Sequence, residues 1–173
     1  MERNIRVYSA SLRSFFSAQL FGMLAVALLA SCSSAPPPTS PQASPEPKEP
    51  TPADIIDYAR TYMGAPYQYG GTSRKGLDCS GLVYSVYDRF NVELPRTVRE
   101  QVKIGAAVQR TDLIEGDLVF FKTSGRWPVG HVGIYVGDGK FIHASTTARR
   151  VRVDTLTQDY FHWRFAGARR VMN

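Results

Sequence analysis

Cys79 has the residue type and the position of a nucleophile. It follows Asp78 at the start of a segment in which apolar residues recur at helical spacing, so the sequence predicts a helix that begins at the cysteine. Free amide groups and the positive end of the helix dipole stabilise a thiolate at such a start, and they would lower the cysteine pKa from about 8.5. A thiol nucleophile also needs a base, usually histidine. The sequence offers His131, His143 and His162.

The turn of one predicted hairpin decides whether two of these histidines act together. If Asp138 and Gly139 form a two-residue turn, His131 and His143 project from opposite faces of the hairpin. If residues 137–139 form a three-residue loop with Gly139 in the left-handed conformation, both histidines share one face, with Cβ atoms about 7 Å apart. The second register also gathers an apolar set on the other face: Val132, Ile134, Val136, Ile142 and Ala144. Because burial of this set favours the three-residue loop, we predict a Cys-His-His constellation.

Helical patterns come first along the chain and strand patterns follow. A first helix is expected behind Thr51 and Pro52, a second from Cys79, and a short third after Thr97, where Glu100 completes a capping-box pattern. Alternating apolar residues then predict five strands, at 117–122, 129–136, 140–145, 151–153 and 164–171. This order predicts an α+β fold in which N-terminal helices pack on a central antiparallel sheet of about five strands.

The composition and the N-terminal segments predict one domain that follows a membrane anchor and a tether. The 173 residues suffice for one domain with appendages, and the formal charge of +6 is mild. Residues 1–31 have the basic start and short apolar run of a secretory signal, and their end resembles a bacterial lipobox in which Cys32 is acylated. Residues 32–52 hold eight of the eleven prolines and predict an extended tether. The domain is expected over residues 53–173.

Six motifs in order resemble those of the NlpC family, papain-like cysteine peptidases that cut peptidoglycan stem peptides. They are Pro66-Tyr67-Gln68-Tyr69-Gly70-Gly71, Leu77-Asp78-Cys79-Ser80-Gly81-Leu82-Val83, Leu94-Pro95-Arg96-Thr97, Gly116-Asp117-Leu118-Val119-Phe120-Phe121, His131-Val132-Gly133-Ile134-Tyr135 and Phe141-Ile142-His143-Ala144. The resemblance covers nearly all of residues 54–172 and implies the papain-like fold. The lipobox suits the Gram-negative members, and Ser33 resembles the residue of lipoproteins sorted to the outer membrane.

The resemblance implies a role for each residue of the site. Cys79 would be the nucleophile, His131 the base that takes its proton, and His143 the residue that orients His131. Tyr67 would help hold the oxyanion beside the Cys79 backbone amide. Asp78 and Ser80 match positions that contact the substrate in some members.

Several of these residues also have a purely structural interpretation. Asp78 also fits a helix cap, and Tyr67 could simply pack its ring. Arg96 fits a loop salt bridge better than a substrate carboxylate, and His162 is expected to be structural or exposed. The arginines around residues 149–152 and 169–170 are expected to form a solvated face.

The sequence therefore predicts a lipid-anchored peptidoglycan endopeptidase on the periplasmic side of the outer membrane. It would cleave a γ-D-glutamyl-diaminopimelate or D-alanyl-diaminopimelate bond. A thiol amidase acting on another amide and a non-catalytic scaffold or binding lipoprotein are the alternatives. No metal, no cofactor and no nucleic-acid partner are expected. The need for an activating protein, and whether the loop from Thr123 to Val129 blocks the cleft, stay open.

Overall fold

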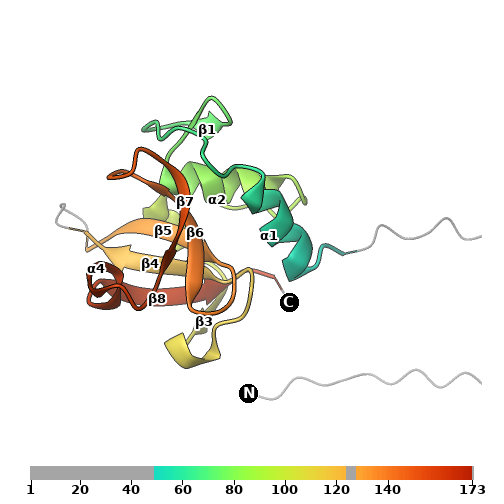
Figure 1. Ribbon diagram of the computed structural model, residues 1–173. Helices are drawn as coiled ribbons and strands as arrows, with labels where there is room; N and C mark the ends of the chain where they lie inside the picture. Colours follow the sequence, from blue (N-terminus) through green and yellow to red (C-terminus); the bar gives the residue numbers. More distant parts are fainter. Residues whose placement is uncertain (1–48, 124–127, 173) are drawn as a thin grey trace, which may run out of the picture. The chain divides into compact units, whose positions relative to one another are not determined.

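An antiparallel sheet of six strands organises the domain (Figure 1). The computed structural model describes residues 49–123 and 128–172. The strand order is β3-β8-β4-β5-β6-β7, and every neighbouring pair is antiparallel. The strands are β3 (Ala106–Val108), β4 (Leu118–Lys122), β5 (Val129–Tyr135), β6 (Lys140–Ser145), β7 (Arg150–Thr155) and β8 (Phe165–Arg170). The predicted α+β class is confirmed, and the sheet has one strand more than the expected five.

The additional strand, β3, is short and carries little hydrophobic signal. Its three residues are Ala106, Ala107 and Val108, and none of them is buried. The strand forms because it pairs with the exposed edge of β8, with Ala107 opposite Arg169. Strand formation at this edge therefore depends on a distant partner rather than on a local alternation of apolar residues.

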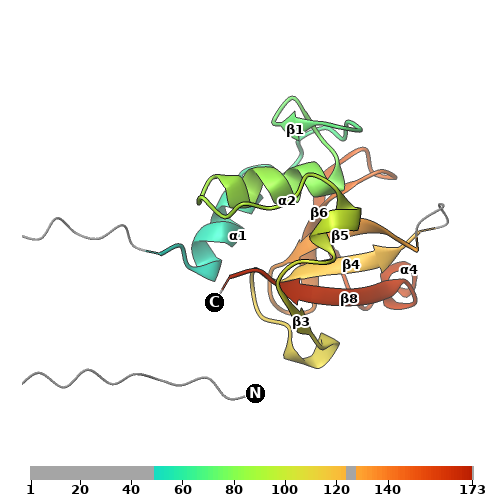
Figure 2. The same cartoon turned by 180° about the vertical axis from the view of Figure 1, so that it is seen from behind.

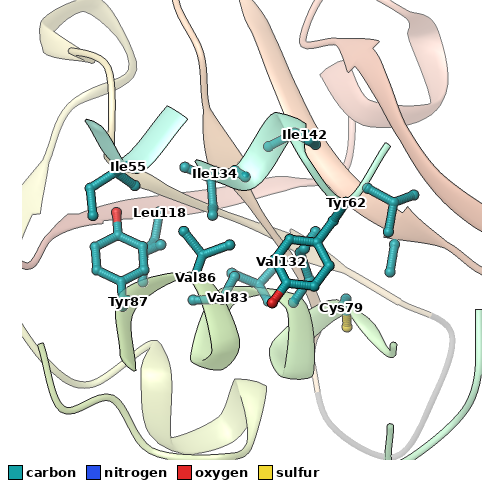
Figure 3. Close-up of a cluster of buried hydrophobic side chains, with 14 of the residues drawn as sticks. Ile55, Tyr62, Cys79, Val83, Val86, Tyr87, Leu118, Val132, Ile134 and Ile142 are labelled. Atoms are coloured by element: carbon teal, nitrogen blue, oxygen red, sulfur yellow. The ribbon is translucent and has the colours of Figure 1, made fainter. Parts of the chain in front are cut away.

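Helices α1 (Pro52–Arg60) and α2 (Cys79–Asp88) lie on one face of the sheet (Figures 1 and 2). Figure 3 shows the cluster between them and the strands, with Val83 and Val86 of α2 against Val132 and Ile134 of β5. A second cluster covers the opposite face, where Phe161 of the short helix α4 (Asp159–His162) packs. Its other buried members are Val119, Phe121, Phe141, Leu156 and Ala168. Both faces of the central strands are thus buried.

The hairpin of β5 and β6 has the predicted three-residue register. Ile134 lies opposite Ile142 and Tyr135 lies opposite Phe141, which leaves residues 137–139 as the loop. The Val136 amide donates to the Lys140 carbonyl at 2.9 Å. All three loop residues have positive φ, 86°, 51° and 68°, which explains the two glycines on either side of Asp138. Both histidines therefore come from one face of the hairpin, and the five predicted apolar residues are buried on the other.

The starts of the helices follow the predicted caps in two of three cases. Thr51 caps α1 and forms a complete capping box with Asp54, and Pro52, the last residue of the predicted tether, is the first residue of this helix. Asp78 caps α2 by accepting a hydrogen bond from the Gly81 amide at 2.6 Å.

The predicted capping box at Thr97 is wrong. Helix α3 (Val98–Gln101) is a single turn without a side-chain cap bond. The Glu100 amide donates to the Thr97 carbonyl, so the Thr97 hydroxyl donates to the Glu100 carboxylate instead, at 2.6 Å.

The remaining described elements are small. Strands β1 (Thr72–Ser73) and β2 (Gly76–Leu77) form a separate hairpin that leads into α2, and η1 (Arg110–Asp112) is a single 3₁₀ turn. Within the described ranges, none of the helices has both the length and the apolar character needed to cross a bilayer. The predicted signal, Cys32 and most of the predicted tether lie outside the described residues, as do residues 124–127 of the loop that follows Thr123.

Candidate active site

Cys79 is the first residue of α2 and lies where the core meets a cleft. Its side chain is 8% exposed, and Figure 3 shows its sulfur at the margin of the hydrophobic cluster. The thiol lines a cleft of about 920 Å³ and also an adjoining cavity of about 120 Å³. A substrate in the cleft can therefore reach the sulfur, while the apolar side of α2 fixes its position.

The environment of this thiol differs from the expectation for a helix start. The pKa of Cys79 is raised to about 11, chiefly by burial and also by the charge of the nearby Asp78 carboxylate. The amides of Val132, Ser80 and Cys79 itself lower the pKa, but they do not compensate for the lost water. The predicted lowering of the thiol pKa is therefore wrong for the free protein. The thiol is neutral at pH 7 and needs a base at the moment of attack.

Two histidines on neighbouring strands supply the candidate base and its partner. His131 on β5 and His143 on β6 are joined by a hydrogen bond of 2.7 Å between Nε2 of His131 and Nδ1 of His143. Their rings are nearly perpendicular, at 88°. The pKa of His131 is lowered to about 3, chiefly by burial and also by the neighbouring His143, against the opposing charge of Asp154. Cys79, His131 and His143 all line the smaller cavity, so the fold brings the three predicted residues together.

Asp154 on β7 completes the polar row, and the sequence analysis missed it. Its Oδ2 lies 2.9 Å from Nε2 of His143, and its Oδ1 lies 2.6 Å from Nη2 of Arg152. Burial raises the pKa of Asp154, but the hydrogen bond from His143 and the charge of Arg152 together bring it below its ordinary value. A signal was present, because Arg152 and Asp154 alternate with Val151 and Val153. The predicted strand stopped at residue 153, two residues before the end of β7 (Arg150–Thr155), and so left Asp154 out.

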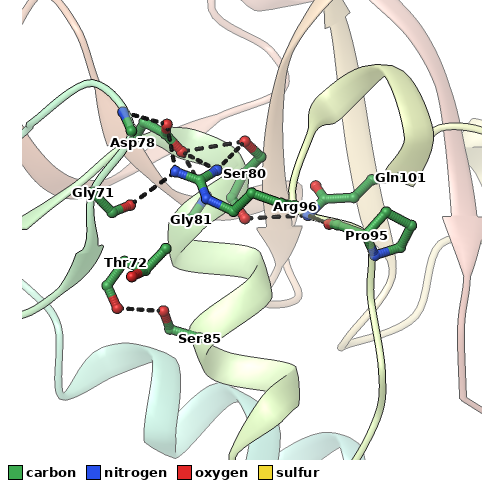
Figure 4. Close-up of polar contacts among 10 residues, drawn as sticks. Gly71, Thr72, Asp78, Ser80, Gly81, Ser85, Pro95, Arg96 and Gln101 are labelled. Atoms are coloured by element: carbon green, nitrogen blue, oxygen red, sulfur yellow. Dashed lines mark hydrogen bonds and ion pairs between the residues drawn. The ribbon is translucent and has the colours of Figure 1, made fainter.

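Asp78, Ser80 and Arg96 form a second polar network (Figure 4), and all three line the larger cleft together with Cys79. Arg96 binds Asp78 with both guanidinium nitrogens, at 2.8 and 2.9 Å, and Ser80 Oγ at 2.9 Å. The Gly70 and Gly81 amides also donate to the Asp78 carboxylate. Burial raises the pKa of Asp78, and these hydrogen bonds lower it below the ordinary value. The cap interpretation of Asp78 and the salt-bridge interpretation of Arg96 are confirmed.

Tyr67 borders both cavities and is half-buried against the core. Burial raises its pKa, and the negative charges that Cys79 and Asp78 can carry raise it further. The phenol is therefore protonated at neutral pH and has a hydrogen to donate towards the cleft. Its ring packing and its predicted oxyanion role are compatible, and the role stays a prediction.

His162 lies outside this site. It is exposed on α4, where its Nδ1 lies 3.3 Å from Arg110 and its ring contacts Trp163 edge-on. The predicted structural or exposed placement of His162 is confirmed. In the part of the chain that the structure describes, no three His, Cys, Asp or Glu residues are arranged to hold a metal ion.

A cysteine at a helix start, facing an antiparallel sheet that carries two hydrogen-bonded histidines, defines the papain-like class of thiol hydrolase fold. The model of the NlpC/P60 family matches residues 64–170, more than half of the chain. The chain belongs to the NlpC/P60 family.

Curated relatives and a solved structure agree with this assignment. Murein DD-endopeptidase MepH of Escherichia coli is 46% identical over 114 residues, which are 64% of this chain and 42% of MepH. The probable endopeptidase NlpC of E. coli is 42% identical over 120 residues, covering 69% of this chain and 77% of NlpC. The crystal structure of an NlpC/P60 family protein from Bacillus cereus has a TM-score of 0.69 at 35% identity, covering 73% of this chain and 42% of that one. This chain therefore spans under half of MepH and of the B. cereus protein.

Another relative carries a different activity in its name. The gamma-D-glutamyl-L-lysine dipeptidyl-peptidase of Bacillus subtilis is 37% identical over 121 residues, which are 69% of this chain and 41% of that protein. Relatives of this chain are thus named for two different peptidase activities.

Proposed function

We propose that the protein is a peptidoglycan hydrolase, a cysteine endopeptidase that cleaves an amide bond in stem peptides. The observation that carries the proposal is the convergence of Cys79, His131 and His143 on one cavity that opens beside a large cleft. Relatives named as murein endopeptidases support the substrate class.

The site suggests how the reaction proceeds. Because the thiol and the imidazole are both neutral in the free protein, the Cys79 proton moves to His131 as the sulfur attacks the carbonyl carbon. The Cys79 backbone amide and the Tyr67 hydroxyl face the developing oxyanion. His131 then gives its proton to the leaving amine. Water, deprotonated by His131, then attacks the thioester carbonyl. The C–S bond breaks, the peptide leaves with a new carboxyl group, and the proton on His131 returns to the Cys79 sulfur.

The network around Asp78 favours a substrate without a free N-terminal amine. A carboxylate offers about four lone-pair positions. Five groups already donate to Asp78: two nitrogens of Arg96, the amides of Gly70 and Gly81, and the Ser80 hydroxyl. No acceptor position is left for an ammonium group, and Arg96 balances the charge. This arrangement suits an internal bond of an attached or cross-linked stem, and the D-alanyl-diaminopimelate crosslink is our first choice.

The test is digestion of purified peptidoglycan by residues 33–173, with the Cys79→Ala variant as the control. Mass spectrometry of the released fragments identifies the bond from the new termini. Fragments that require Cys79 and end in D-alanine support the crosslink, and fragments that begin with diaminopimelate support the γ-D-glutamyl bond. Absence of any Cys79-dependent fragment from crosslinked and uncrosslinked material would overturn the hydrolase and favour the alternative, a binding lipoprotein.

The anchored location belongs to the same proposal. The lipobox-like sequence before Cys32 supports lipidation there, and Ser33 supports sorting to the outer membrane, facing the periplasm. Labelling with a radioactive fatty acid should mark the full chain but not the Cys32→Ala variant. Equal labelling of the two chains would contradict a lipid at this position.

A further inference from the structure

Asp154 lies at the buried end of a hydrogen-bonded row that leads to the candidate base. The row runs from His131 to His143 to Asp154, with donor-acceptor distances of 2.7 and 2.9 Å. We propose that Asp154 is a positioning residue that sets the tautomer of both histidines and leaves Nδ1 of His131 free to take the Cys79 proton. The inference rests on the proposed thiol chemistry, and the tautomers themselves can be measured without it.

The first step concerns the proton between Asp154 and His143. Arg152 holds one carboxylate oxygen of Asp154 at 2.6 Å, so the group is ionised and only accepts hydrogen bonds. Nε2 of His143 faces the other oxygen. This nitrogen must therefore carry a hydrogen and donate it to Asp154.

The second step transfers this constraint to His131. In its neutral form a histidine carries one ring hydrogen, so Nδ1 of His143 has a lone pair when Nε2 is protonated. Nδ1 of His143 lies 2.7 Å from Nε2 of His131, which must then donate. The hydrogen of neutral His131 is thus on Nε2. Its Nδ1 keeps the lone pair, which is what a base for the thiol requires.

The packing holds the middle imidazole in the orientation that this relay needs. His143 is 2% exposed, and the rings of Phe141 and Phe161 lie against it with centroid distances of 4.9 and 5.5 Å. Strand pairing places Arg152 directly opposite His143, with Asp154 two residues further along β7. The carboxylate therefore approaches His143 from a fixed strand. In this proposal Asp154 influences Cys79 through the two imidazoles.

The Asp154→Asn variant tests the proposal, because an amide has nearly the same shape but can donate as well as accept. If its NH₂ group donates to Nε2 of His143, both histidines change tautomer and His131 loses its free Nδ1. Replacing a carboxylate that contacts the base directly costs about 10⁴-fold in kcat. Because His143 separates Asp154 from His131, we expect a smaller fall in kcat for Asp154→Asn, on the order of 10²- to 10³-fold. KM should change less than about threefold, and Asp154→Glu should recover part of kcat.

The deciding readout is the protonation of the ring nitrogens. The full chain is labelled with ¹⁵N in its three histidines, purified in detergent and studied by NMR, with the His162→Gln variant assigning the exposed ring. We expect hydrogen on Nε2 of His131 and of His143 in the wild type, and on Nδ1 in a measurable share of Asp154→Asn. Hydrogen on Nδ1 of either histidine in the wild type would overturn the proposal. A variant that loses kcat with unchanged tautomers would also overturn it, by leaving Asp154 a structural role.

Alkylation of Cys79 by iodoacetamide, quantified on the Cys79 peptide, gives a second readout that needs no peptidoglycan. The rate should fall in Asp154→Asn and stay within about threefold in the matched Arg150→Gln variant, which changes an exposed arginine at the start of the same strand. An unchanged rate in Asp154→Asn would contradict the proposal. Correct wild-type tautomers together with absent peptidoglycan cleavage would refute the proposed function alone, and the positioning role of Asp154 would stand.

Discussion

Two buried aspartates, each paired with an arginine, belong to the two polar networks of the candidate site. Asp78 binds Arg96 at the start of α2, and Asp154 binds Arg152 behind the histidines. The donors of Asp78 are mostly backbone amides and Arg96, so its network ends in the scaffold. One donor of Asp154 is His143, which contacts the candidate base, His131. The same type of ion pair, aspartate with arginine, thus supports the structure at Asp78 and the chemistry at Asp154. The difference lies in the other groups that donate hydrogen bonds to each aspartate.

The largest expected effect lies on the histidine side. His131→Gln removes the base, and we expect kcat for peptidoglycan cleavage to fall by about 10⁴-fold, because an unassisted neutral thiol is a poor nucleophile. His162→Gln is the matched control, since it removes an exposed imidazole outside the site, and it should keep full activity. Equal losses in the two variants would show that His131 is not the base.

The Asp78 side should respond chiefly in stability. Asp78→Ala removes the α2 cap and leaves Arg96 without its partner, so the free energy of unfolding should fall by about 2–3 kcal/mol in urea titration. The figure is below that of a fully buried pair because the Arg96 side chain is 33% exposed. Asp88→Ala, an exposed change at the other end of the same helix, should change it by less than about 0.5 kcal/mol. A stable Asp78→Ala protein would mean that the network is not structural.

Mild acid should reduce the free energy of unfolding through His131 on the histidine side before it affects the two aspartates. Burial lowers the pKa of His131 to about 3, whereas the unfolded chain binds this proton near about 6.5. Between these values the unfolded state holds more protons, so the free energy of unfolding falls as the pH is lowered, by up to about 1.4 kcal/mol per unit. The two aspartates, whose pKa values are lowered, contribute only nearer and below pH 4.

Urea titrations between pH 7 and pH 4.5 measure this slope. The His131→Gln protein should lose most of it, and His162→Gln should keep it. An identical slope in the wild type and in His131→Gln would show that another group controls acid unfolding.

The smallest expected effect tests how tightly the histidines are held. A Cβ at Gly133 would lie 2.7 Å from the Phe141 ring, 2.9 Å from the Ile142 carbonyl and 3.3 Å from the His143 Cβ. Gly133→Ala should therefore displace His143 and reduce kcat about tenfold. Gly139→Ala meets no atom within 4 Å but is strained at its positive φ, so it should cost about 1 kcal/mol of stability and leave kcat unchanged. Full activity of Gly133→Ala would mean that His143 tolerates displacement.

Much of the site could be predicted because its determinants are local. The hairpin register followed from five apolar residues that need one face, and the start of α2 followed from a capping aspartate before a helical stripe. Asp154 could not be assigned in this way. Its contact with His143 exists only because β7 pairs with β6, and no pattern within residues 150–155 indicates that partner.

The sequence by itself determined the candidate nucleophile, the two histidines on one face and the order of helices before strands, because side-chain periodicity and capping act over a few residues. The tertiary structure alone decided the sixth strand, the approach of Asp154 and the neutral state of the thiol. Each of these depends on segments distant along the chain: strand pairing creates the edge for β3 and brings β7 to His143, and packing of α2 on the sheet excludes water from Cys79. Burial of Cys79 raises the thiol pKa more than the amides at the helix start lower it, and only the folded chain determines how deeply the thiol is buried.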